Sequence, residues 1–553
     1  MKHRIFLLLT VFAISVLAAV AAREPKQPTI FNGVDFEEMN FWVDSVMSSM
    51  TLDEKIGQLI VAQVMPSTDQ NNKAWIKKLI NRYHIGGLLY TKGKLKEQAE
   101  LTNYAQSITD VPLLMTLDGE WGLSMRFTDA VRYPRNMVLG AIADDRLLYE
   151  YGRGIARQCR RAGIQVNFAP VLDVNDNPEN PVIGTRSYGE APELVARHGI
   201  AYSKGLEDGG VLSVAKHFPG HGNTSQDSHK TLPTINKNRS QLKACEFVPF
   251  TQYIDAGLSG MLTAHLYIPA LFDEQIPSSL SHKVVTDLLQ TEMGFNGLIF
   301  TDGLAMKGVT RENDVCVKAL LAGNDVMLGP VNVAGEFASI KNAVASGRLS
   351  KQLIEARCRK MLQYKYVLGL NKRQHIKTAG LVTDINSGRA EALANKLWAA
   401  AITVVKNDSA LLPLKELDKT RVAVLSLGGK GGLTSMFQNR CRMYAETGKF
   451  DYYDGMSIER LCRELNEYDV VLAAVHSSDR KYASALDQIS QKVTGKLVSV
   501  MFTSAYSTAR FASALGRSSA VVMAYDDCNL AEDYAAQTVF GGNAASGKLP
   551  VSI

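Results

Sequence analysis

The sequence predicts an α/β protein in which a TIM (β/α)8 barrel is followed by a smaller doubly wound α/β sandwich domain. The first observation behind the barrel is that eight short apolar runs alternate with stretches long enough for helices, such as Asp145–Gly163 and Ala191–Gly209. Eight β/α units in about 320 residues are typical of a TIM barrel. An open doubly wound sheet is the alternative that this alternation leaves open. The eight runs, each expected to form a buried strand, are Ile56–Val64, Ile85–Tyr90, Pro112–Asp118, Ile164–Val174, Val211–His217, Gly260–Leu266, Phe295–Leu304 and Ala322–Leu328.

The second observation is the position of polar residues at or just past the C-terminal ends of these runs. In a barrel, all these ends converge on one face, where active sites are built. Polar residues with only structural roles would have no reason to keep that placement. The residues concerned are Asp118, Asp173, Lys216, His217, His265 and Asp302.

A second α/β region follows the barrel. Lys351–Leu370 is expected to be an amphipathic helix, and the helix Ala390–Val405 is expected to open the second region after a polar linker. The expected strands of that region are Arg421–Leu427, Asp469–Val475, Gly495–Phe502 and Ala520–Tyr525. We therefore divide the chain into a signal peptide (1–22), a TIM-barrel domain (23–370), a linker (371–388) and a C-terminal α/β sandwich domain (389–553).

The N-terminus has the layout of a cleavable secretory signal. Three basic residues, Lys2, His3 and Arg4, precede an apolar run from Ile5 to Val20, and small alanines follow. This n-region, h-region and Ala-x-Ala order predicts cleavage after residue 21 or 22 and export to the periplasm or the medium. A membrane anchor is the alternative, but the run is short for a span. We expect no stable membrane insertion after cleavage.

Composition excludes some classes of partner. The formal net charge is only +6 over 553 residues, and no Lys/Arg-rich run is interleaved with aromatic residues, so we expect no nucleic-acid binding. The seven cysteines are scattered without a Cys-x-x-Cys pair, which argues against a zinc site or a disulfide framework. We therefore expect no cofactor and no metal. The sequence does not indicate an oligomeric state.

Asp302 is the first candidate catalytic residue. Hydrolysis of a glycoside with retention needs a nucleophilic carboxylate and a separate proton donor. Asp302 ends the apolar run Phe295–Leu304 and precedes Gly303, which lets the backbone turn. A carboxylate at such a position is costly to bury without a functional or pairing reason. A helix N-cap is the structural alternative.

The proton donor is expected in a loop that carries three histidines between residues 217 and 229. In an extended Asp-x-His segment, the side chains of Asp227 and His229 point to the same side, so the carboxylate can orient the imidazole and raise its pKa. Such a histidine can donate a proton to a leaving oxygen and later accept one from water. His221 is a rival that lies between two glycines and has no neighbouring carboxylate in the sequence.

Two other chemistries fit the sequence less well. A metal site formed by His217, His221 and His229 is disfavoured because Lys216 lies beside them and all three lie on one flexible loop. A Ser-His-Asp protease is disfavoured because the chain has no Gly-x-Ser-x-Gly motif.

These motifs resemble glycoside hydrolase family 3, in particular its bacterial β-N-acetylglucosaminidase (β-hexosaminidase) branch. The resemblance covers about residues 45–370 and continues into the second region at residues 401–414 and 547–551. It is carried by Met50-Thr-Leu-Asp-Glu-Lys-Ile-Gly-Gln-Leu59, Ile85-Gly-Gly-Leu-Leu-Tyr90, Asn167-Phe-Ala-Pro-Val-Leu-Asp-Val174, Lys216-His-Phe-Pro-Gly-His-Gly222 and Asp227-Ser-His229. The resemblance implies that the barrel is the catalytic domain.

The resemblance also implies residue roles. Asp302 matches the nucleophile, and His229 with its partner Asp227 matches the acid/base dyad. Residues matching sugar contacts are Asp118, Arg126, Lys216 and His217, with Arg186 helping to bind the N-acetylhexosamine.

The implied activity is that of an exported, retaining β-N-acetylglucosaminidase. Its partner would be a substrate with terminal β-linked GlcNAc, from peptidoglycan fragments or chitin-type oligosaccharides. The alternatives are a β-glucosidase or β-xylosidase, a GlcNAc phosphorylase, and a carbohydrate-binding protein without turnover. Family 3 β-glucosidases generally take their acid/base from a different domain, so the Asp-Ser-His segment favours GlcNAc over glucose.

Overall fold

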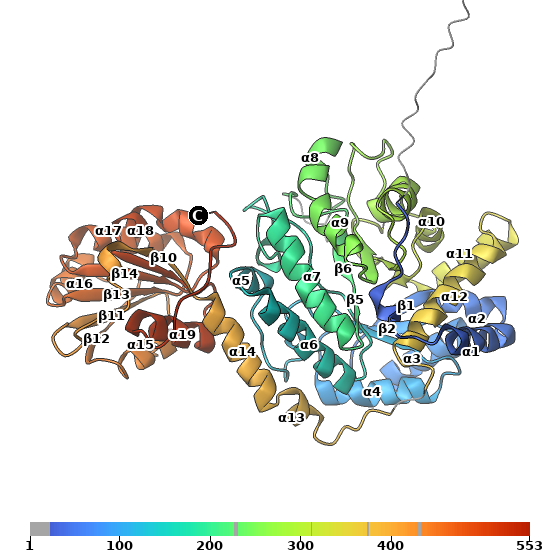
Figure 1. Cartoon of the computed structure of the whole chain (residues 1–553), viewed down its shortest axis with the longest axis horizontal. Helices are drawn as coiled ribbons and strands as arrows, with labels where there is room; N and C mark the ends of the chain where they lie inside the picture. Colours follow the sequence, from blue (N-terminus) through green and yellow to red (C-terminus); the bar gives the residue numbers. More distant parts are fainter. Residues whose placement is uncertain (1–22, 226–230, 311, 373–374, 430–432, 553) are drawn as a thin grey trace, which may run out of the picture.

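The chain forms two lobes, each built around parallel strands (Figure 1). A computed structural model describes residues 23–225, 231–310, 312–372, 375–429 and 433–552 of the 553-residue chain. The first lobe holds strands β1 to β9, and the second holds β10 to β15. This confirms an α/β protein with a second sheet after the first.

The strands of the first lobe run parallel in two hydrogen-bonded sheets. One sheet has the order β5-β4-β3-β2-β1-β9 and the other has the order β6-β7-β8. A parallel bridge from Phe300 in β8 to Val326, just before β9, joins the two sheets on one side. The result is a curled parallel sheet whose strand order follows the chain. The strands are β1 (Ile60–Val64), β2 (Gly87–Tyr90), β3 (Leu114–Leu117), β4 (Val166–Asn167), β5 (Leu212–Ser213), β6 (Ala215–Phe218), β7 (Gly260–Thr263), β8 (Leu298–Thr301) and β9 (Met327–Leu328).

Several expected strands differ from the observed ones; the run Ala322–Leu328, for example, begins at the end of a helix and forms a strand only at Met327–Leu328. The run Val211–His217 forms two short strands, β5 and β6, and Ile164–Val174 forms a strand only at Val166–Asn167. Pro170 has no N–H to donate, so the regular ladder of β4 cannot continue through it. The segment after β4 instead bonds to β6 through Pro170 O and the Leu172 N–H.

Helices cover the outside of this sheet, as expected for a β/α alternation (Figure 1). They are α1 (Phe36–Ser49), α2 (Leu52–Gly57), α3 (Gln70–Tyr83), α4 (Leu95–Ser107), α5 (Asn136–Gly140), α6 (Asp145–Arg161), α7 (Pro192–Asp208), α8 (Arg239–Ala244), α9 (Phe247–Asp255), the π-helix η5 (Lys283–Glu292), α10 (Val315–Ala322), α11 (Val333–Ala345) and α12 (Lys351–Val367). The residues that the structure describes include no helix that is both long and apolar enough to cross a membrane.

Local sequence signals explain where these helices begin and how closely they approach. Thr51 and Glu54 form a capping box at the start of α2. Glycines allow α6 and α7 to touch through their backbones, because a Cβ on Gly152 would lie 2.1 Å from Tyr202 O. A Cβ on Gly205 would lie 2.3 Å from Tyr149 O, so a larger residue would force the helices apart.

The second lobe is a six-stranded sheet with the order β10-β15-β14-β13-β11-β12. All pairs are parallel except β10 with β15. Its strands are β10 (Thr403–Asn407), β11 (Val422–Leu427), β12 (Thr447–Tyr452), β13 (Val470–Val475), β14 (Lys496–Met501) and β15 (Ala520–Met523). Its helices are α14 (Gly388–Ala401), α15 (Met436–Cys441), α16 (Ile458–Leu465), α17 (Arg480–Lys492), α18 (Ala512–Arg517) and α19 (Asn529–Phe540), with the 3-10 helix η7 (Ala505–Phe511).

Sequence reasoning missed both edge strands of this sheet. The helix expected over Ala390–Val405 ends at Ala401, and the chain then enters β10. β10 and β12 are mostly half-buried and include polar residues, so neither shows the continuous apolar run that marks a central strand.

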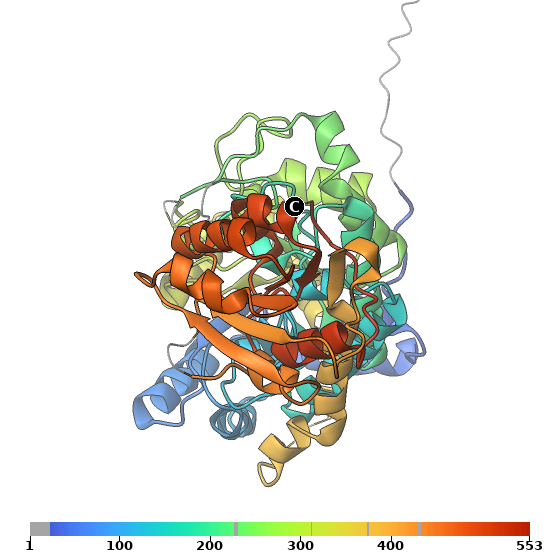
Figure 2. The same cartoon turned by 90° about the vertical axis from the view of Figure 1, so that its left-hand side faces the viewer.

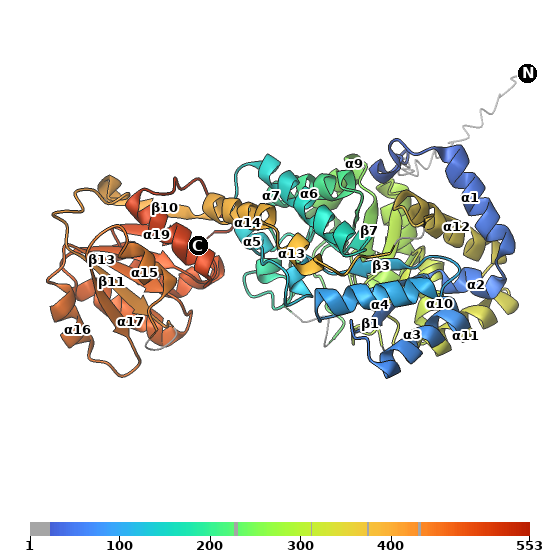
Figure 3. The same ribbon diagram turned by 90° about the horizontal axis from the view of Figure 1, so that it is seen from below.

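The second lobe lies in front of the first in Figure 2 and beside it in Figure 3, and the lobes contact each other at more than one place. The segment between the lobes contains α13 (Leu381–Ile385), and Asn103 bonds to both backbone groups of Ile376. The C-terminal residues return to the first lobe, where Lys548 N donates to Ala141 O at 2.9 Å. A Cβ on Gly189 would lie 2.5 Å from Pro550 O, so this contact is tight.

Lys365 on α12 has a buried amine. Its Nζ donates to Gln58 Oε1 at 2.6 Å, and no carboxylate pairs with it among the described residues. Burial lowers the pKa of Lys365 from 10.5 to about 7. Between about pH 7 and pH 10.5, Lys365 is therefore protonated in the unfolded chain but has lost its proton in the folded protein. The free energy of unfolding should consequently rise with pH in this range. Below about pH 7 the folded protein should carry the whole destabilisation that comes from burying the protonated amine.

We expect Lys365→Met to remove this pH dependence. The free energy of unfolding of the wild type, minus that of the variant, should rise by up to about 2–3 kcal/mol between about pH 7 and pH 9. Urea unfolding at both pH values measures the difference, and the titration of all other groups cancels. If the free energy of unfolding changed equally with pH in the two proteins, Lys365 would not be a buried amine that loses its proton on folding.

Candidate active site

Polar side chains gather at the carboxyl ends of the strands of the first lobe. Asp118 follows β3, Lys216 and His217 lie in β6, His265 follows β7, and Asp302 follows β8. Arg126, directly after the 3-10 helix η2 (Leu123–Met125), and Arg186, at the end of the 3-10 helix η3 (Gly184–Arg186), reach the same place. Asp227 and His229 lie outside the described residues.

Lys216 is the centre of a buried ion network. Its Nζ lies 2.8 Å from Asp118 Oδ1 and 2.9 Å from Glu120 Oε1. Arg126 pairs with the other oxygen of Asp118, and Arg186 makes two hydrogen bonds to Glu120, at 3.0 and 2.7 Å. Burial alone would raise the pKa of Glu120, but Arg186 and Lys216 hold it well below its usual range. The network therefore keeps both carboxylates ionised and places fixed donors and acceptors side by side.

His217 is held by a carboxylate on one side and a guanidinium on the other. Its Nδ1 lies 2.6 Å from Asp173 Oδ2, and its Nε2 lies 3.2 Å from Arg186 Nη2. A guanidinium can only donate, so Nε2 accepts and Nδ1–H donates to Asp173. The ring therefore has one tautomer and one orientation.

Asp302 is positioned by the backbone around it. Its N–H donates to Thr263 O at 2.8 Å, and Gly303 N–H donates to its Oδ1 at 2.7 Å. Burial would raise the pKa of Asp302, but its interactions with His217 and His265, the Gly303 hydrogen bond and the positive charge of Lys216 together lower it. The helix N-cap alternative is wrong, because α10, the next described helix, begins only at Val315. Asp302 is therefore a partly exposed, ionised carboxylate beside positive charge.

Sequence reasoning missed Glu120, which bridges Lys216 and Arg186 with its side chain fully buried. His221 also differs from expectation, because its backbone N–H donates to the Asp173 carboxylate at 2.7 Å. Its ring is buried, and burial lowers the pKa of His221 to about 4. A group that stays neutral down to that pH is a poor proton donor at neutral pH.

The second lobe contacts the loops that carry this site. Tyr506 in η7 bonds to Asn175 through both the side-chain amide, at 2.6 Å, and the backbone oxygen, at 3.2 Å. Asn175 Oδ1 in turn accepts from Gly184 N–H, two residues before Arg186. The second lobe thus supports the loop that places Arg186.

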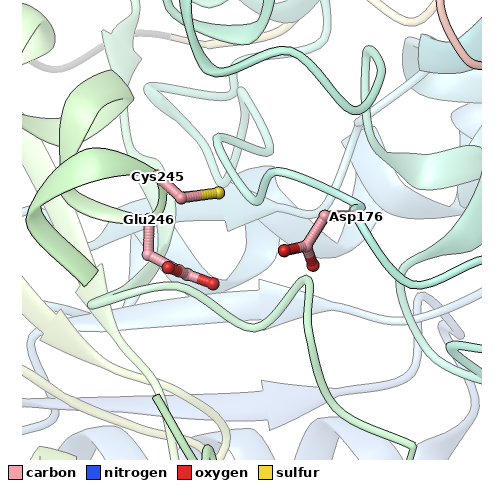
Figure 4. A group of neighbouring side chains, drawn as sticks. All are labelled: Asp176, Cys245 and Glu246. Atoms are coloured by element: carbon pink, nitrogen blue, oxygen red, sulfur yellow. The ribbon is translucent and has the colours of Figure 1, made fainter. Parts of the chain in front are cut away.

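A cluster of possible metal ligands lies beyond the site (Figure 4). Asp176, Cys245 and Glu246 bring their ligand atoms within 4.8 Å of one another. The Lys237 ammonium bonds to both carboxylates of this cluster. The cluster therefore already contains a cation, and we assign it no metal.

Comparison with known proteins identifies the family. The model of the glycosyl hydrolase family 3 N-terminal domain matches residues 51–364, which span all nine strands described in the first lobe. The chain belongs to glycosyl hydrolase family 3. It is therefore a member of an enzyme family that hydrolyses glycosides, as the motifs predicted.

The relatives in family 3 include named enzymes. The chain is 30% identical over 434 residues to the β-hexosaminidase A of Pseudoalteromonas piscicida, covering 72% of this chain and 70% of that protein. It is 27% identical to a β-N-acetylglucosaminidase/β-glucosidase of Cellulomonas fimi, covering 70% and 71%. A solved family 3 β-N-acetylglucosaminidase from Paenibacillus sp. str. FPU-7 has a TM-score of 0.75 at 27% identity, covering 91% of this chain and 99% of that one.

Proposed function

We propose that this family 3 enzyme is an exported, retaining β-N-acetylglucosaminidase that releases terminal β-linked GlcNAc from peptidoglycan fragments or chitin-type oligosaccharides. The observation that carries the proposal is the ionised Asp302 carboxylate at the end of β8, beside the ordered network of Lys216, Glu120 and Arg186. The names of the relatives supply the class of sugar.

In the proposed first step, an Asp302 oxygen attacks C1 of the GlcNAc residue and forms a glycosyl-enzyme. The imidazolium of His229, oriented by Asp227, gives its proton to the leaving oxygen as the glycosidic bond breaks. In the second step, His229 takes a proton from water, the hydroxide oxygen bonds to C1, and Asp302 leaves as a carboxylate. The two steps together retain the β configuration.

The ion network suits the binding of sugar hydroxyls. Asp118 accepts hydrogen bonds, while Lys216 and Arg126 donate them. Because these groups are already paired with one another, their side chains are held in position before the substrate binds. Less conformational entropy is therefore lost on binding. We propose Asp118, Arg126, Lys216 and His217 as contacts of the sugar ring and Arg186 as a contact of the N-acetylhexosamine unit.

We also infer that the first lobe closes into a (β/α)8 barrel. Consecutive strands are parallel neighbours, and the bridge between Phe300 and Val326 supports closure on one side. On the other side, β5 runs directly into β6, and a bridge joins Val171 to Lys216. The signal peptide, the linker and the domain boundaries set out above remain predictions from the sequence.

The alternatives differ in sugar or acceptor. The Cellulomonas fimi relative is named for both GlcNAc and glucoside cleavage, so a β-glucosidase is the second candidate. A histidine acid/base carries no negative charge that would repel phosphate, which makes phosphorolysis a variant of the same mechanism.

Rates on aryl β-GlcNAc and aryl β-glucoside, each with and without phosphate, test the proposal. We expect faster release from the GlcNAc substrate and free GlcNAc as the product, also from chitobiose and muropeptides. GlcNAc 1-phosphate as the main product would replace hydrolysis by phosphorolysis. Faster cleavage of the glucoside would contradict the proposed specificity. If neither substrate were cleaved, the chain would be a carbohydrate-binding protein without turnover.

A further inference from the structure

Asp302 is held by two neighbours that are themselves held by buried side chains. Gly303 N–H donates to Asp302 Oδ1 at 2.7 Å, and Asp302 N–H donates to Thr263 O at 2.8 Å. Both bonds use backbone groups of the neighbours. The direction of the carboxylate therefore depends on whatever fixes the backbone of Gly303 and Thr263.

His265, which follows β7, fixes the Gly303 side. Its Nε2 lies 3.2 Å from Gly303 O, which also accepts from Met306 N–H at 3.0 Å. A carbonyl oxygen can only accept, so Nε2 carries a hydrogen and donates it. Burial lowers the pKa of His265, so the imidazole is neutral at pH 7 and its Nδ1 can accept. Ser279, in the 3-10 helix η4 (Ser278–Leu280), places its Oγ 2.7 Å from this Nδ1 and donates to it.

Asn324, three residues before β9, connects this arrangement to the Thr263 side. Its Nδ2 donates to Ser279 O at 2.8 Å and to Ala319 O at 2.9 Å. Because both of these carbonyl oxygens need a donor, the NH₂ end of the amide faces them. The Oδ1 end therefore faces Thr263 and accepts from its Oγ1 at 2.8 Å. The amide thus links Thr263 to Ser279.

These bonds form a closed network, called the Asp302 network below. Its members, in order, are Asp302, Gly303, His265, Ser279, Asn324 and Thr263. The last four are 0% exposed, so they leave a sugar no surface to contact, whereas Asp302 is partly exposed. In a closed network each hydrogen bond restrains the next one. The buried members can therefore act on a substrate only through Asp302.

From this geometry we propose that His265, Ser279 and Asn324 are positioning residues that direct the Asp302 carboxylate toward C1 of the substrate. The inference rests on the proposed function, in which Asp302 attacks C1. Ser279 selects the His265 tautomer whose N–H faces Gly303 O. In the other tautomer a lone pair would face that oxygen, and the repulsion would turn the peptide that holds the carboxylate.

The demand on position explains why such a network matters for the rate. Reacting atoms have to lie about 3–3.5 Å apart before attack, and a displacement of about 1 Å can reduce the rate about 100-fold. A carboxylate held only by flexible neighbours would spend much of its time outside this range. The network restrains it before the substrate binds.

The test compares four single variants of the full-length chain with the wild type. Ser279→Ala removes the hydroxyl, and His265→Leu removes both ring nitrogens. His265→Gln keeps a side-chain N–H that can reach Gly303 O. Ser213→Ala is the matched control, because its hydroxyl in β5 is equally buried but donates to Glu207 Oε1, at 2.7 Å, instead of to the Asp302 network.

Three quantities are measured for each protein. The first is kcat/KM on whichever of aryl β-GlcNAc and aryl β-glucoside the wild type cleaves faster, which reports stabilisation of the transition state. The second is the dissociation constant of the corresponding free sugar, measured by calorimetry. The third is the thermal unfolding midpoint, which separates loss of activity from loss of stability.

We expect kcat/KM to fall about 10-fold in Ser279→Ala and about 100-fold in His265→Leu, because the nucleophile is then misplaced. His265→Gln should stay within about tenfold of the wild type, since it keeps the donor to Gly303 O. The dissociation constant of the free sugar should change by less than about threefold in all three variants, because the sugar contacts are intact. Ser213→Ala should lower the unfolding midpoint about as much as Ser279→Ala does and keep the wild-type kcat/KM.

The proposal is overturned if Ser279→Ala and His265→Leu both keep kcat/KM within about twofold of the wild type. Equal losses in His265→Gln and His265→Leu would also overturn it, because the N–H donor would then have no effect. A parallel loss of sugar binding, or an equal loss of kcat/KM in Ser213→Ala, would replace positioning by a general loss of structure. Should His265→Leu not fold, Ser279→Ala decides.

Failure of the proposed function would be a different result. In that case Asp302→Ala would keep its activity, whatever the variants of the Asp302 network do. An inactive Asp302→Ala together with fully active Ser279→Ala and His265→Leu would instead leave the nucleophile in place and remove only the role of the network.

Discussion

Asp302→Ala should abolish hydrolysis of an aryl β-N-acetylglucosaminide, with kcat falling on the order of 10⁴-fold or more, as when other covalent nucleophiles are removed. The physical reason is that no other carboxylate is available to bond to C1 in the proposed mechanism. Asp118 and Glu120 are already paired with Lys216, Arg126 and Arg186. Initial rates at saturating substrate measure the loss.

Two controls separate loss of the nucleophile from loss of the fold. The variant should keep a wild-type circular dichroism spectrum, and added azide should partly restore turnover because it can enter the vacated space and attack C1. Product configuration then distinguishes the routes, since direct attack by azide on the substrate inverts C1. An Asp302→Ala enzyme with more than about a tenth of wild-type kcat would sink the assignment.

His229→Ala should behave differently from Asp302→Ala. If His229 donates the proton, the loss should be much larger on substrates with poor leaving groups than on activated aryl substrates, which leave without protonation. Because His229→Ala keeps Asp302, this variant should still form the glycosyl-enzyme on Asp302 without added azide. Equal loss on both kinds of substrate would argue that His229 is not the acid.

Glu120→Ala should have the second-largest effect, on both stability and activity. The free energy of unfolding should fall by about 3–5 kcal/mol, the cost of leaving buried charges without their partner. Arg186 loses its carboxylate, and Lys216 keeps only Asp118. Sugar binding should weaken as well, because each cation then loses one of the partners that fix its position. Urea unfolding and KM for the aryl β-GlcNAc substrate measure the two effects.

Two matched variants make this prediction sharp. Glu120→Gln keeps the shape but not the charge, and should fall between the wild type and Glu120→Ala in stability. Glu459→Ala removes an exposed carboxylate that pairs with Lys492, and should change stability little. Equal effects for Glu120→Ala and Glu459→Ala would show that the buried network adds nothing to the fold.

The central strands could be predicted because a strand that is buried on both faces appears in the sequence as a continuous apolar run. Leu114–Leu117 and Leu298–Thr301 are buried at every position, and both lie in runs that the sequence predicts as strands. The edge strands Thr403–Asn407 and Thr447–Tyr452 could not, because their partial exposure removes the apolar run. The same logic applies to Ile164–Val174, where a buried segment continues beyond the two residues that form the regular ladder.

The candidate site was predicted in its chain positions but not in its pairings. Asp118, Lys216, His217 and Asp302 stand at or near the ends of predicted apolar runs, and the structure brings them together, although Lys216 and His217 lie within β6. Glu120 carries no comparable sign, since it lies in a turn and only its burial distinguishes it. Tyr506 lies 331 residues from Asn175, a contact that no local pattern can indicate. The roles of Asp227 and His229 remain predictions, because both lie outside the described residues.

The sequence by itself determined the family, the alternation of strands and helices, and the residue types available for the chemistry. These are local properties, written in hydrophobic periodicity and in short motifs such as Lys216-His217 and Asp227-Ser-His229. Only the tertiary structure decided which charges neutralise each other and which tautomer His217 adopts. These depend on distances between segments far apart in the chain, and the energy of a buried charge depends on those distances rather than on its neighbours in sequence.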